Sequence, residues 1–201
     1  MLELNAPGAA AVFAVTIGLS LLGIYRVPRI IEVCLFRPHG YPQPGRADTI
    51  VTSGFVHADL PHLAFNMITF WFFAFPMELR IGTLAFLALY ALGLVLSHAC
   101  TWLKHKDNPR YASLGASGAI SAVLFAYIVY YPMRELYILP FPFPIPAPLF
   151  AVGYVAWSWW ASNHARGRIN HDAHLCGAIA GLLFVAMTDP RAFTALLSLL
   201  R

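Results

Sequence analysis

The chain has 201 residues, of which 59% are hydrophobic and only 11% are charged, and its formal net charge is +4. Soluble domains carry about 25% charged residues because their surfaces face water, so this composition excludes an ordinary soluble domain. It also excludes disordered, collagen-like and coiled-coil chains, and the scattered basic residues argue against a nucleic-acid partner. The sequence therefore predicts an integral, multi-pass membrane protein surrounded by the lipid bilayer.

Six apolar segments are long enough to form membrane-spanning helices, since a span needs about 20 apolar residues. Together they predict one all-α membrane domain over residues 1–201. The expected helices, in chain order, cover residues of about 8–26, 60–79, 81–103, 115–132, 147–165 and 171–188. The first helix follows Met1 without a basic region and is expected to remain as a span rather than to be cleaved as a signal peptide. Alternating prolines delay the start of the fifth helix to about Ala147, because proline removes a helix hydrogen bond.

The connection between the first two expected helices, about residues 27–59, is long and rich in proline, glycine and charge. A connection of this length in a compact domain is usually functional or carries short helices of its own. The other connections are short, apart from the proline-rich stretch before the fifth helix.

The three cysteines do not indicate a disulfide framework. Cys34, Cys100 and Cys176 are odd in number and lack the C-x-x-C spacing that is typical of zinc ribbons and redox motifs. Cys176 is interpreted as a small apolar packing residue within the last helix.

Polar side chains within the expected spans gather near one face of the membrane. The second, fourth and sixth helices run in the same direction, and each carries polar residues in its first turns: His62 and Asn66, then Ser117, then His174. His57, just before the second helix, lies at the same face. Polar groups are costly in hydrocarbon and mark functional sites, and a serine gathered with histidines indicates nucleophilic catalysis.

Glycines accompany both the serine and the last histidine. Gly115 and Gly118 flank the serine and allow a tight turn into the helix, whose free N–H groups can stabilise an oxyanion. Gly177 and Gly181 follow the histidine at a spacing that permits close helix packing. The expected partner surface on the fourth helix consists of Gly118, Ala119 and Ala122.

Packing is the alternative explanation for each of these features taken alone, because glycines serve helix contacts and an intramembrane Asn66 or His98 can simply hydrogen-bond a neighbouring helix. A second functional hypothesis is a metal-dependent enzyme or transporter with His57, His62 and His174 as zinc ligands. The sequence has no H-E-x-x-H motif and no acidic residue deep in a span, so neither a metal nor another cofactor is predicted. The shared placement of the polar residues on three helices of the same direction favours catalysis.

The order of these motifs resembles that of the rhomboid intramembrane serine proteases in their six-helix form, over most of the chain from Thr52 to Gly181. The resemblance rests on His57-x4-His62-x3-Asn66, Glu78-x3-Gly82, Gly115-x-Ser117-Gly118 and Ala173-His174-x2-Gly177-x3-Gly181. It implies a six-helix rhomboid-like bundle. It also implies a serine endopeptidase that hydrolyses peptide bonds in or near the transmembrane segments of membrane-protein substrates.

The resemblance further implies a role for each matching residue. Ser117 would be the nucleophile and His174 the general base of a Ser–His dyad. His62 and Asn66 would help the Ser117 backbone N–H to bind the oxyanion. Two more residues would brace the first loop and the second helix, respectively: His57 and Glu78.

Three features bear on how closely the family pattern is followed. A Trp-Arg pair is common about eight to nine residues before the first matching histidine, where this chain has Asp48 and Thr49, and Arg46 is a candidate substitute. Ser121 stands where the family usually has an aromatic ring that stacks on the catalytic histidine. Asp172 is two residues from that histidine and points to another side of the helix, so a dyad is expected rather than a triad.

The family resemblance and the distribution of basic residues predict opposite orientations in the membrane. The resemblance implies a cytoplasmic N-terminus and a site open to the outside, and the expected location is the bacterial inner membrane. In that orientation only four of the 13 basic residues lie on inner segments, whereas the positive-inside rule favours the reverse. A third hypothesis is a non-catalytic relative that only binds membrane helices, although such relatives typically lack the serine or the histidine.

Overall fold

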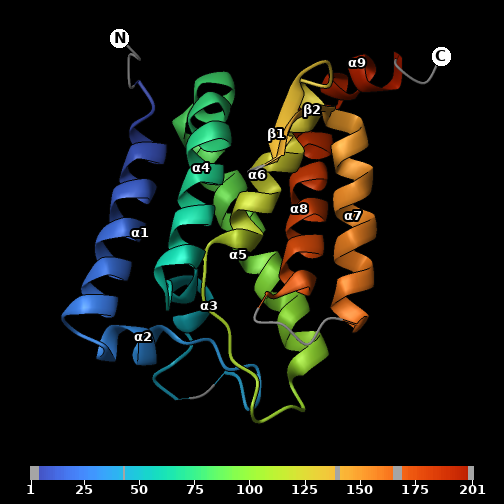
Figure 1. Cartoon of the computed structure of the whole chain (residues 1–201). Coiled ribbons are helices and arrows are strands. Elements are labelled where there is room, and N and C mark those ends of the chain that lie inside the picture. Colours follow the sequence, from blue (N-terminus) through green and yellow to red (C-terminus); the bar gives the residue numbers. More distant parts are fainter. Residues whose placement is uncertain (1–4, 43, 139–140, 165–168, 199–201) are drawn as a thin grey trace.

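The computed structural model describes residues 5–42, 44–138, 141–164 and 169–198, and in this part of the chain six long helices lie side by side (Figure 1). They are α1 (Pro7–Tyr25), α4 (Leu60–Ile81), α5 (Thr83–His105), α6 (Ser117–Tyr130), α7 (Ala147–His164) and α8 (His171–Thr188). The predicted all-α membrane bundle is confirmed, and each helix begins and ends within two residues of its expected range. Met1 and residue 165 lie outside the described residues.

Five shorter helices and one pair of strands connect or follow the long helices among the described residues. They are α2 (Arg29–Cys34), α3 (Thr49–Thr52), η1 (Ser53–Phe55), β1 (Glu135–Ile138), β2 (Phe141–Pro146), η2 (Pro190–Ala192) and α9 (Phe193–Ser198). The strands β1 and β2 pair antiparallel, with Leu136 opposite Ile145. Proline cannot donate a hydrogen bond to a sheet and is confined to edge strands, which both strands of a two-stranded sheet are. The proline-rich stretch is therefore extended rather than helical.

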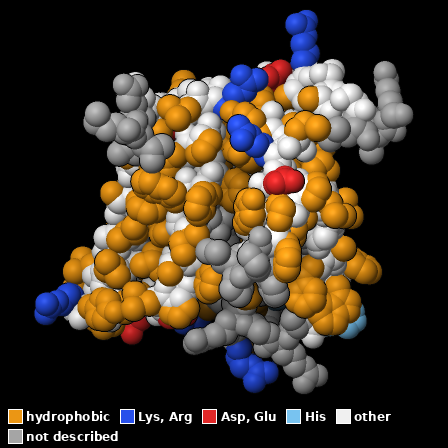
Figure 2. Space-filling view, turned by 45° about the horizontal axis from the view of Figure 1, so that its top comes forward, with side chains coloured by type: hydrophobic (Ala, Val, Ile, Leu, Met, Phe, Trp, Pro, Cys, Tyr) orange, Lys and Arg blue, Asp and Glu red, His pale blue; other side chains and the backbone are white. Residues whose placement is uncertain are grey.

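The apolar surface of the bundle fits a membrane. In the part of the chain that the structure describes, four helices, α1, α4, α5 and α8, are long and apolar enough to cross a membrane by length and composition. Figure 2 shows hydrophobic side chains covering the wall of the bundle, while the charged side chains in view lie toward its top and bottom.

Helix α6 is shorter than expected and lies at the centre of the bundle. It has 14 residues, about 21 Å at 1.5 Å per residue, and almost all of them are buried between α4, α5, α7 and α8. Its start is set by Gly115, whose φ of +117° is left-handed and breaks the helix geometry two residues before Ser117. The chain from 106 to 116 therefore rises into the bundle before α6 begins, so Ser117 lies deeper than a helix starting at the membrane face would place it (Figure 1).

Arg46 braces the long first loop from within. Its guanidinium donates a hydrogen bond to the Glu32 carbonyl at 3.1 Å, and its own carbonyl accepts from the Thr49 N–H at 3.2 Å and the Thr49 hydroxyl at 2.7 Å. These bonds join α2 to the start of α3. They supply internal support to a loop that has Asp48 and Thr49 in place of a Trp-Arg pair.

A disulfide between Cys100 and Cys176 joins α5 to α8, with the two Cα atoms 6.4 Å apart. The interpretation of Cys176 as a packing residue is therefore wrong. The two helices are antiparallel neighbours, and this proximity brings together positions 76 residues apart, which sequence spacing alone does not reveal. Cys34 is a free thiol, and burial raises its pKa.

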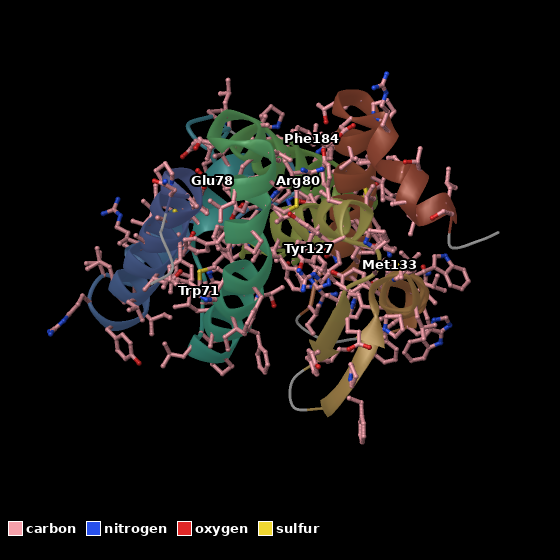
Figure 3. All side chains as sticks on the ribbon, turned by 90° about the horizontal axis from the view of Figure 1, so that it is seen from above. Trp71, Glu78, Arg80, Tyr127, Met133 and Phe184 are labelled. Carbon is pink, nitrogen blue, oxygen red and sulfur yellow. A yellow bond between two sulfur atoms is a disulfide. The ribbon has the colours of Figure 1, made fainter. Side chains whose placement is uncertain are left out.

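A buried carboxylate fastens the beginning of α1 to the end of α4. Glu78 is only 2% exposed, and it accepts hydrogen bonds from the N–H groups of Gly8 and Ala9 and from the Thr83 hydroxyl at 2.6 Å. The first N–H groups of a helix have no partner within it, and a negative charge there is favoured by the helix dipole. Figure 3 shows α1 and α4 side by side at Glu78, seen from above.

Replacing this carboxylate should destabilise the protein. In Glu78→Ala the two α1 N–H groups and the Thr83 hydroxyl lose their acceptor, and each unsatisfied buried donor costs about 1–3 kcal/mol. The melting temperature in detergent should fall clearly. The matched control is Asp107→Ala, which removes an exposed carboxylate and should leave the melting temperature unchanged. Equal melting temperatures for the two variants would show that Glu78 does not hold α1.

Candidate active site

The polar residues singled out from the sequence come from three helices of the same direction. Helices α4, α6 and α8 all run from the lower to the upper end of the bundle in Figure 1. Ser117 is the first residue of α6, His174 lies in the first turn of α8, and His62 lies in the first turn of α4. These three residues are partly exposed.

Close contact between α6 and α8 brings Ser117 and His174 to neighbouring positions. A Cβ atom built on Gly177 would overlap the Gly118 carbonyl oxygen, and one built on Gly181 would overlap that of Ala122. A Cβ on Gly118 would in turn lie 3.3 Å from the Ala173 carbonyl oxygen. The residues flanking the serine therefore touch the residues flanking the histidine, at a distance that only glycine permits.

Among the described residues, no hydrogen bond links the Ser117 hydroxyl to the His174 ring. Hydrogen bonds between a nucleophile and its base are often long in the absence of substrate and tighten in the complex. The contact of Gly118 with Gly177 keeps the two backbones close, so the hydrogen bond of the dyad is one that the substrate complex would have to complete.

The first loop holds the segment that precedes Ser117. Phe36 and Ser113 exchange two backbone hydrogen bonds of 3.1 and 3.0 Å. The Gly115 N–H donates to the Ser53 carbonyl at 2.9 Å, and the Ala116 N–H points to His57 Nε2 at 3.4 Å. The segment that leads into α6 is therefore fixed at three positions by the connection between α1 and α4.

His57 lies at the centre of this support. It is fully buried, and burial lowers its pKa to about 3, so the ring is neutral at physiological pH. Because Nε2 accepts from the Ala116 N–H, the proton of the neutral ring is on Nδ1, which donates to the Ser20 hydroxyl at 3.2 Å. The same hydroxyl accepts from the His57 backbone N–H at 3.0 Å. His57 thus ties α1 to the start of α6.

These hydrogen bonds occupy both ring nitrogens of His57, so neither is free to bind zinc. The hypothesis of zinc bound by His57, His62 and His174 therefore loses a ligand, although the His57 and His62 rings are only 4.8 Å apart. Among the described residues, no group of three or more His, Cys, Asp or Glu side chains is placed to hold a metal ion.

His62 and Asn66 line the side of the site that α4 provides. The His62 ring packs against Gly115, where a Cβ atom would lie 2.6 Å from His62 Cε1. Asn66 is 7% exposed, and its Nδ2 donates to the His62 carbonyl at 3.0 Å. An amide nitrogen carries two protons, so one N–H of Asn66 remains for a further acceptor.

The end of α5 fixes the beginning of α8. Asn170 caps α8 by accepting from the Ala173 N–H at 3.0 Å, and its Nδ2 donates to the Thr101 hydroxyl at 2.9 Å. The Asp172 carboxylate pairs with Lys104 at 2.7 Å and lies 3.2 Å from the ring of His105, both on α5. It is therefore directed away from His174. Asn170 was not singled out from the sequence, although an asparagine before an apolar helix is a typical cap.

His98 is part of the same support. Its Nε2 lies 2.7 Å from the Ser53 hydroxyl, and its Nδ1 lies 2.8 Å from the Leu94 carbonyl oxygen. His98 therefore ties α5 to the first loop, close to the Ser53 carbonyl that holds Gly115.

An aromatic ring from α7 stacks on the candidate base. The Tyr154 ring lies 6.1 Å from the His174 ring at an interplanar angle of 25°, and the Tyr154 hydroxyl is 2.6 Å from the hydroxyl of Ser121. The sequence shows that Ser121 lacks a ring but does not show that a ring arrives from elsewhere. Tyr154 stands in an apolar helix, 37 residues from Ser117, and no local pattern marks it.

Comparison with known proteins identifies the family. The Rhomboid domain matches residues 44–191, and the chain belongs to the rhomboid family. It is 31% identical over 150 residues to the mitochondrial RHOMBOID-like protein 12 of Arabidopsis thaliana, covering 67% of this chain and 44% of the relative. It is 29% identical over 140 residues to the mitochondrial Rhomboid protein 1 of Saccharomyces cerevisiae, covering 68% of this chain and 40% of the relative.

The mitochondrial Presenilin-associated rhomboid-like protein of Homo sapiens is 32% identical over 138 residues, covering 68% of this chain and 36% of the relative. The chain thus matches less than half the length of each of these relatives. All three are mitochondrial proteins, so they give no support to the expectation of a bacterial inner membrane. An integral membrane protein of the rhomboid family is the conclusion that fold and comparison share.

The glycine contact between α6 and α8 is directly testable. In Gly177→Ala a single methyl group overlaps the Gly118 carbonyl, so the two helices must separate, and overpacking of this kind costs about 1–3 kcal/mol. We expect a lower melting temperature and a loss of about 10²-fold in the reactivity of Ser117 toward a fluorophosphonate, because a shift of about 1 Å costs that much.

The matched control is Gly18→Ala in α1, where a Cβ atom meets nothing within 4 Å. It should leave both the melting temperature and the reactivity unchanged. The argument from close packing is wrong if Gly177→Ala behaves like this control.

Proposed function

We propose that the chain is an intramembrane serine endopeptidase that hydrolyses peptide bonds in or near the transmembrane segments of membrane proteins. The observation that carries the proposal is the contact of Gly118 with Gly177, which sets the first residue of α6 beside the first turn of α8. Ser117 and His174 are thereby adjacent, partly exposed and surrounded by an apolar bundle. Membership of the rhomboid family supports the same activity.

In the proposed reaction the Ser117 Oγ attacks the carbonyl carbon of the scissile peptide bond and His174 takes up the hydroxyl proton. The C–N bond of the resulting tetrahedral intermediate then breaks, and His174 gives the proton to the leaving amine. Water next attacks the acyl-enzyme with His174 again as the base, which releases the new carboxylate and restores the serine. No acidic third residue takes part, because Asp172 is paired with Lys104.

The oxyanion of the intermediate would be bound where α6 begins. The N–H groups in the first turn of a helix lack partners within the helix, and they favour negative charge. The ring of His62 lies against Gly115, just before this turn, and the unused N–H of Asn66, one turn further along α4, would be a further donor. Gly115 itself is required there, because its positive φ and the nearby His62 ring leave no room for a side chain.

A non-catalytic protein that binds membrane helices is the alternative within the same family. Its fold would be unchanged, and its membrane-protein partners would be of the same kind. The presence of both Ser117 and His174 at adjacent positions favours the protease, and the substitution of either residue separates the two hypotheses.

Ser117→Ala and His174→Ala should each abolish cleavage of a transmembrane substrate by the protein reconstituted in liposomes, while the melting temperature stays close to that of the wild type. A nucleophile and its base act as a unit, so the double variant should be no slower than either single variant. The matched controls are Ser198→Ala and His164→Ala, which change exposed residues and should retain activity. Near wild-type turnover in either active-site variant would exclude the dyad.

Asn66→Ala should lower kcat by about 10²–10³-fold with little change in KM, which is the typical effect of losing one oxyanion donor. Asn163→Ala provides a matched control, because Asn163 is exposed on α7 and its Nδ2 makes the same bond to a carbonyl four residues earlier, at 3.0 Å. It should leave both constants unchanged. A rise in KM with unchanged kcat in Asn66→Ala would assign Asn66 to substrate docking instead.

A further inference from the structure

Tyr154 is a residue of α7 that contacts the His174 ring directly and is linked to Ser117 through Ser121. Its ring stacks on the His174 ring, with centroids 6.1 Å apart and planes inclined by 25°. Its hydroxyl lies 2.6 Å from Ser121 Oγ on α6. Ser121 is only 3% exposed, so this hydrogen bond is sheltered from water.

The direction of the hydrogen bonds follows from counting protons. The Ser121 hydroxyl donates its only proton to the Ser117 carbonyl at 2.8 Å. It can therefore only accept from Tyr154, whose hydroxyl must be the donor. The result is a chain from the Tyr154 hydroxyl through Ser121 to the peptide carbonyl of the nucleophile itself. The Tyr154 side chain thus stacks on His174 with its ring, and its hydroxyl is linked to Ser117 through Ser121.

The packing of α7 on the rest of the bundle makes this double contact consequential. An open apolar depression of about 620 Å³ lies on α7, lined by Val152, Val155 and Trp159 of that helix and by Phe125 of α6. In Figure 1, α7 stands at the edge of the bundle beside α8. Tyr154 also packs against Phe125, with the ring centroids 5.4 Å apart and the planes inclined by 59°.

We propose that Tyr154 is a positioning residue that sets the plane of the His174 ring relative to Ser117, so that the base is aligned only while α7 is packed against α6 and α8. This inference rests on the proposed protease function. It adds that the state of α7 controls the alignment of the dyad, because the ring that holds the base is carried by the helix at the edge of the bundle. Ser121 takes part by fixing the Tyr154 hydroxyl.

The alternative is that Tyr154 merely fills space between α7 and α8. A space-filling role would affect stability but would not change the rate at which Ser117 reacts once the protein is folded. The reaction of Ser117 with a fluorophosphonate separates the two, because this small probe needs the serine and its base but no docking of a transmembrane substrate.

The test measures fluorophosphonate labelling together with kcat and KM for a transmembrane substrate in liposomes. Tyr154→Leu removes the ring and should lower both the labelling rate and kcat by about 10²-fold, with KM changed by less than about threefold. Tyr154→Phe keeps the ring and should lose only about three- to tenfold. Ser121→Ala should match Tyr154→Phe, and the double variant should be no slower than either, since both remove the same hydrogen bond.

Trp157→Leu is the matched control, because Trp157 is an aromatic residue of the same helix that is 61% exposed. It should label at the wild-type rate. A folded Tyr154→Leu that labels at the wild-type rate would overturn the inference, and so would an effect confined to KM. Failure of the wild type itself to label or to cleave would instead reject the proposed function, so the two failures are distinguishable.

Discussion

The approach of α6 to α8 is the constraint on which the candidate site depends. Two carbonyl oxygens of α6, those of Gly118 and Ala122, occupy the space where side chains at 177 and 181 would stand. The two backbones are therefore in direct contact, and the helix that carries the serine is in register with the one that carries the histidine. In lipid, where apolar burial gives no net drive to association, contact of this kind is a main source of helix packing.

The other elements hold α6 and α8 on two sides, and the contacts on the two sides differ in kind. On one side the first loop holds the segment before Ser117 through Ser53 and His57, and the end of α5 holds the start of α8 through Asn170. The contacts of Ser53 and His57 are made with the backbone before Ser117, and that of Asn170 joins two side chains. On the other side stands α7, which contacts α6 and α8 through the hydroxyl and the ring of Tyr154 and carries an open apolar depression. The candidate site is thus held by several hydrogen bonds on one side and mainly by side-chain packing on the other.

Charged residues and glycines made part of the fold predictable from the sequence. Charged residues are excluded from hydrocarbon, so the charge-free intervals located the helices, and the spacing of Gly177 and Gly181 predicted a close contact with α6. The start of α6 depends on the backbone angle of Gly115, which sequence does not specify. The support from His57 required a partner, Ser20, that lies in a helix with no other mark of function.

The residues that sequence reasoning missed are those whose role arises from tertiary neighbours alone. Tyr154 belongs to an apolar helix in which aromatic residues are common, and nothing local distinguishes it from residues that face lipid. The pairing of Cys100 with Cys176 is of the same kind, because only the antiparallel arrangement of α5 and α8 brings the two together. The roles of Ser117, His174, His62 and Asn66 remain predictions that the geometry supports.

The disulfide has a consequence for the connectivity of the chain. It closes a covalent loop that contains all of α6 and α7, while the two helices at its ends, α5 and α8, are joined to each other directly. A break in the backbone on either side of α7 would leave one molecule rather than two, held together through sulfur. The attachment of α8, which carries His174, to α5 therefore does not depend on an unbroken backbone through α7. That helix can be displaced, or even cut at one end, without releasing α8 from α5.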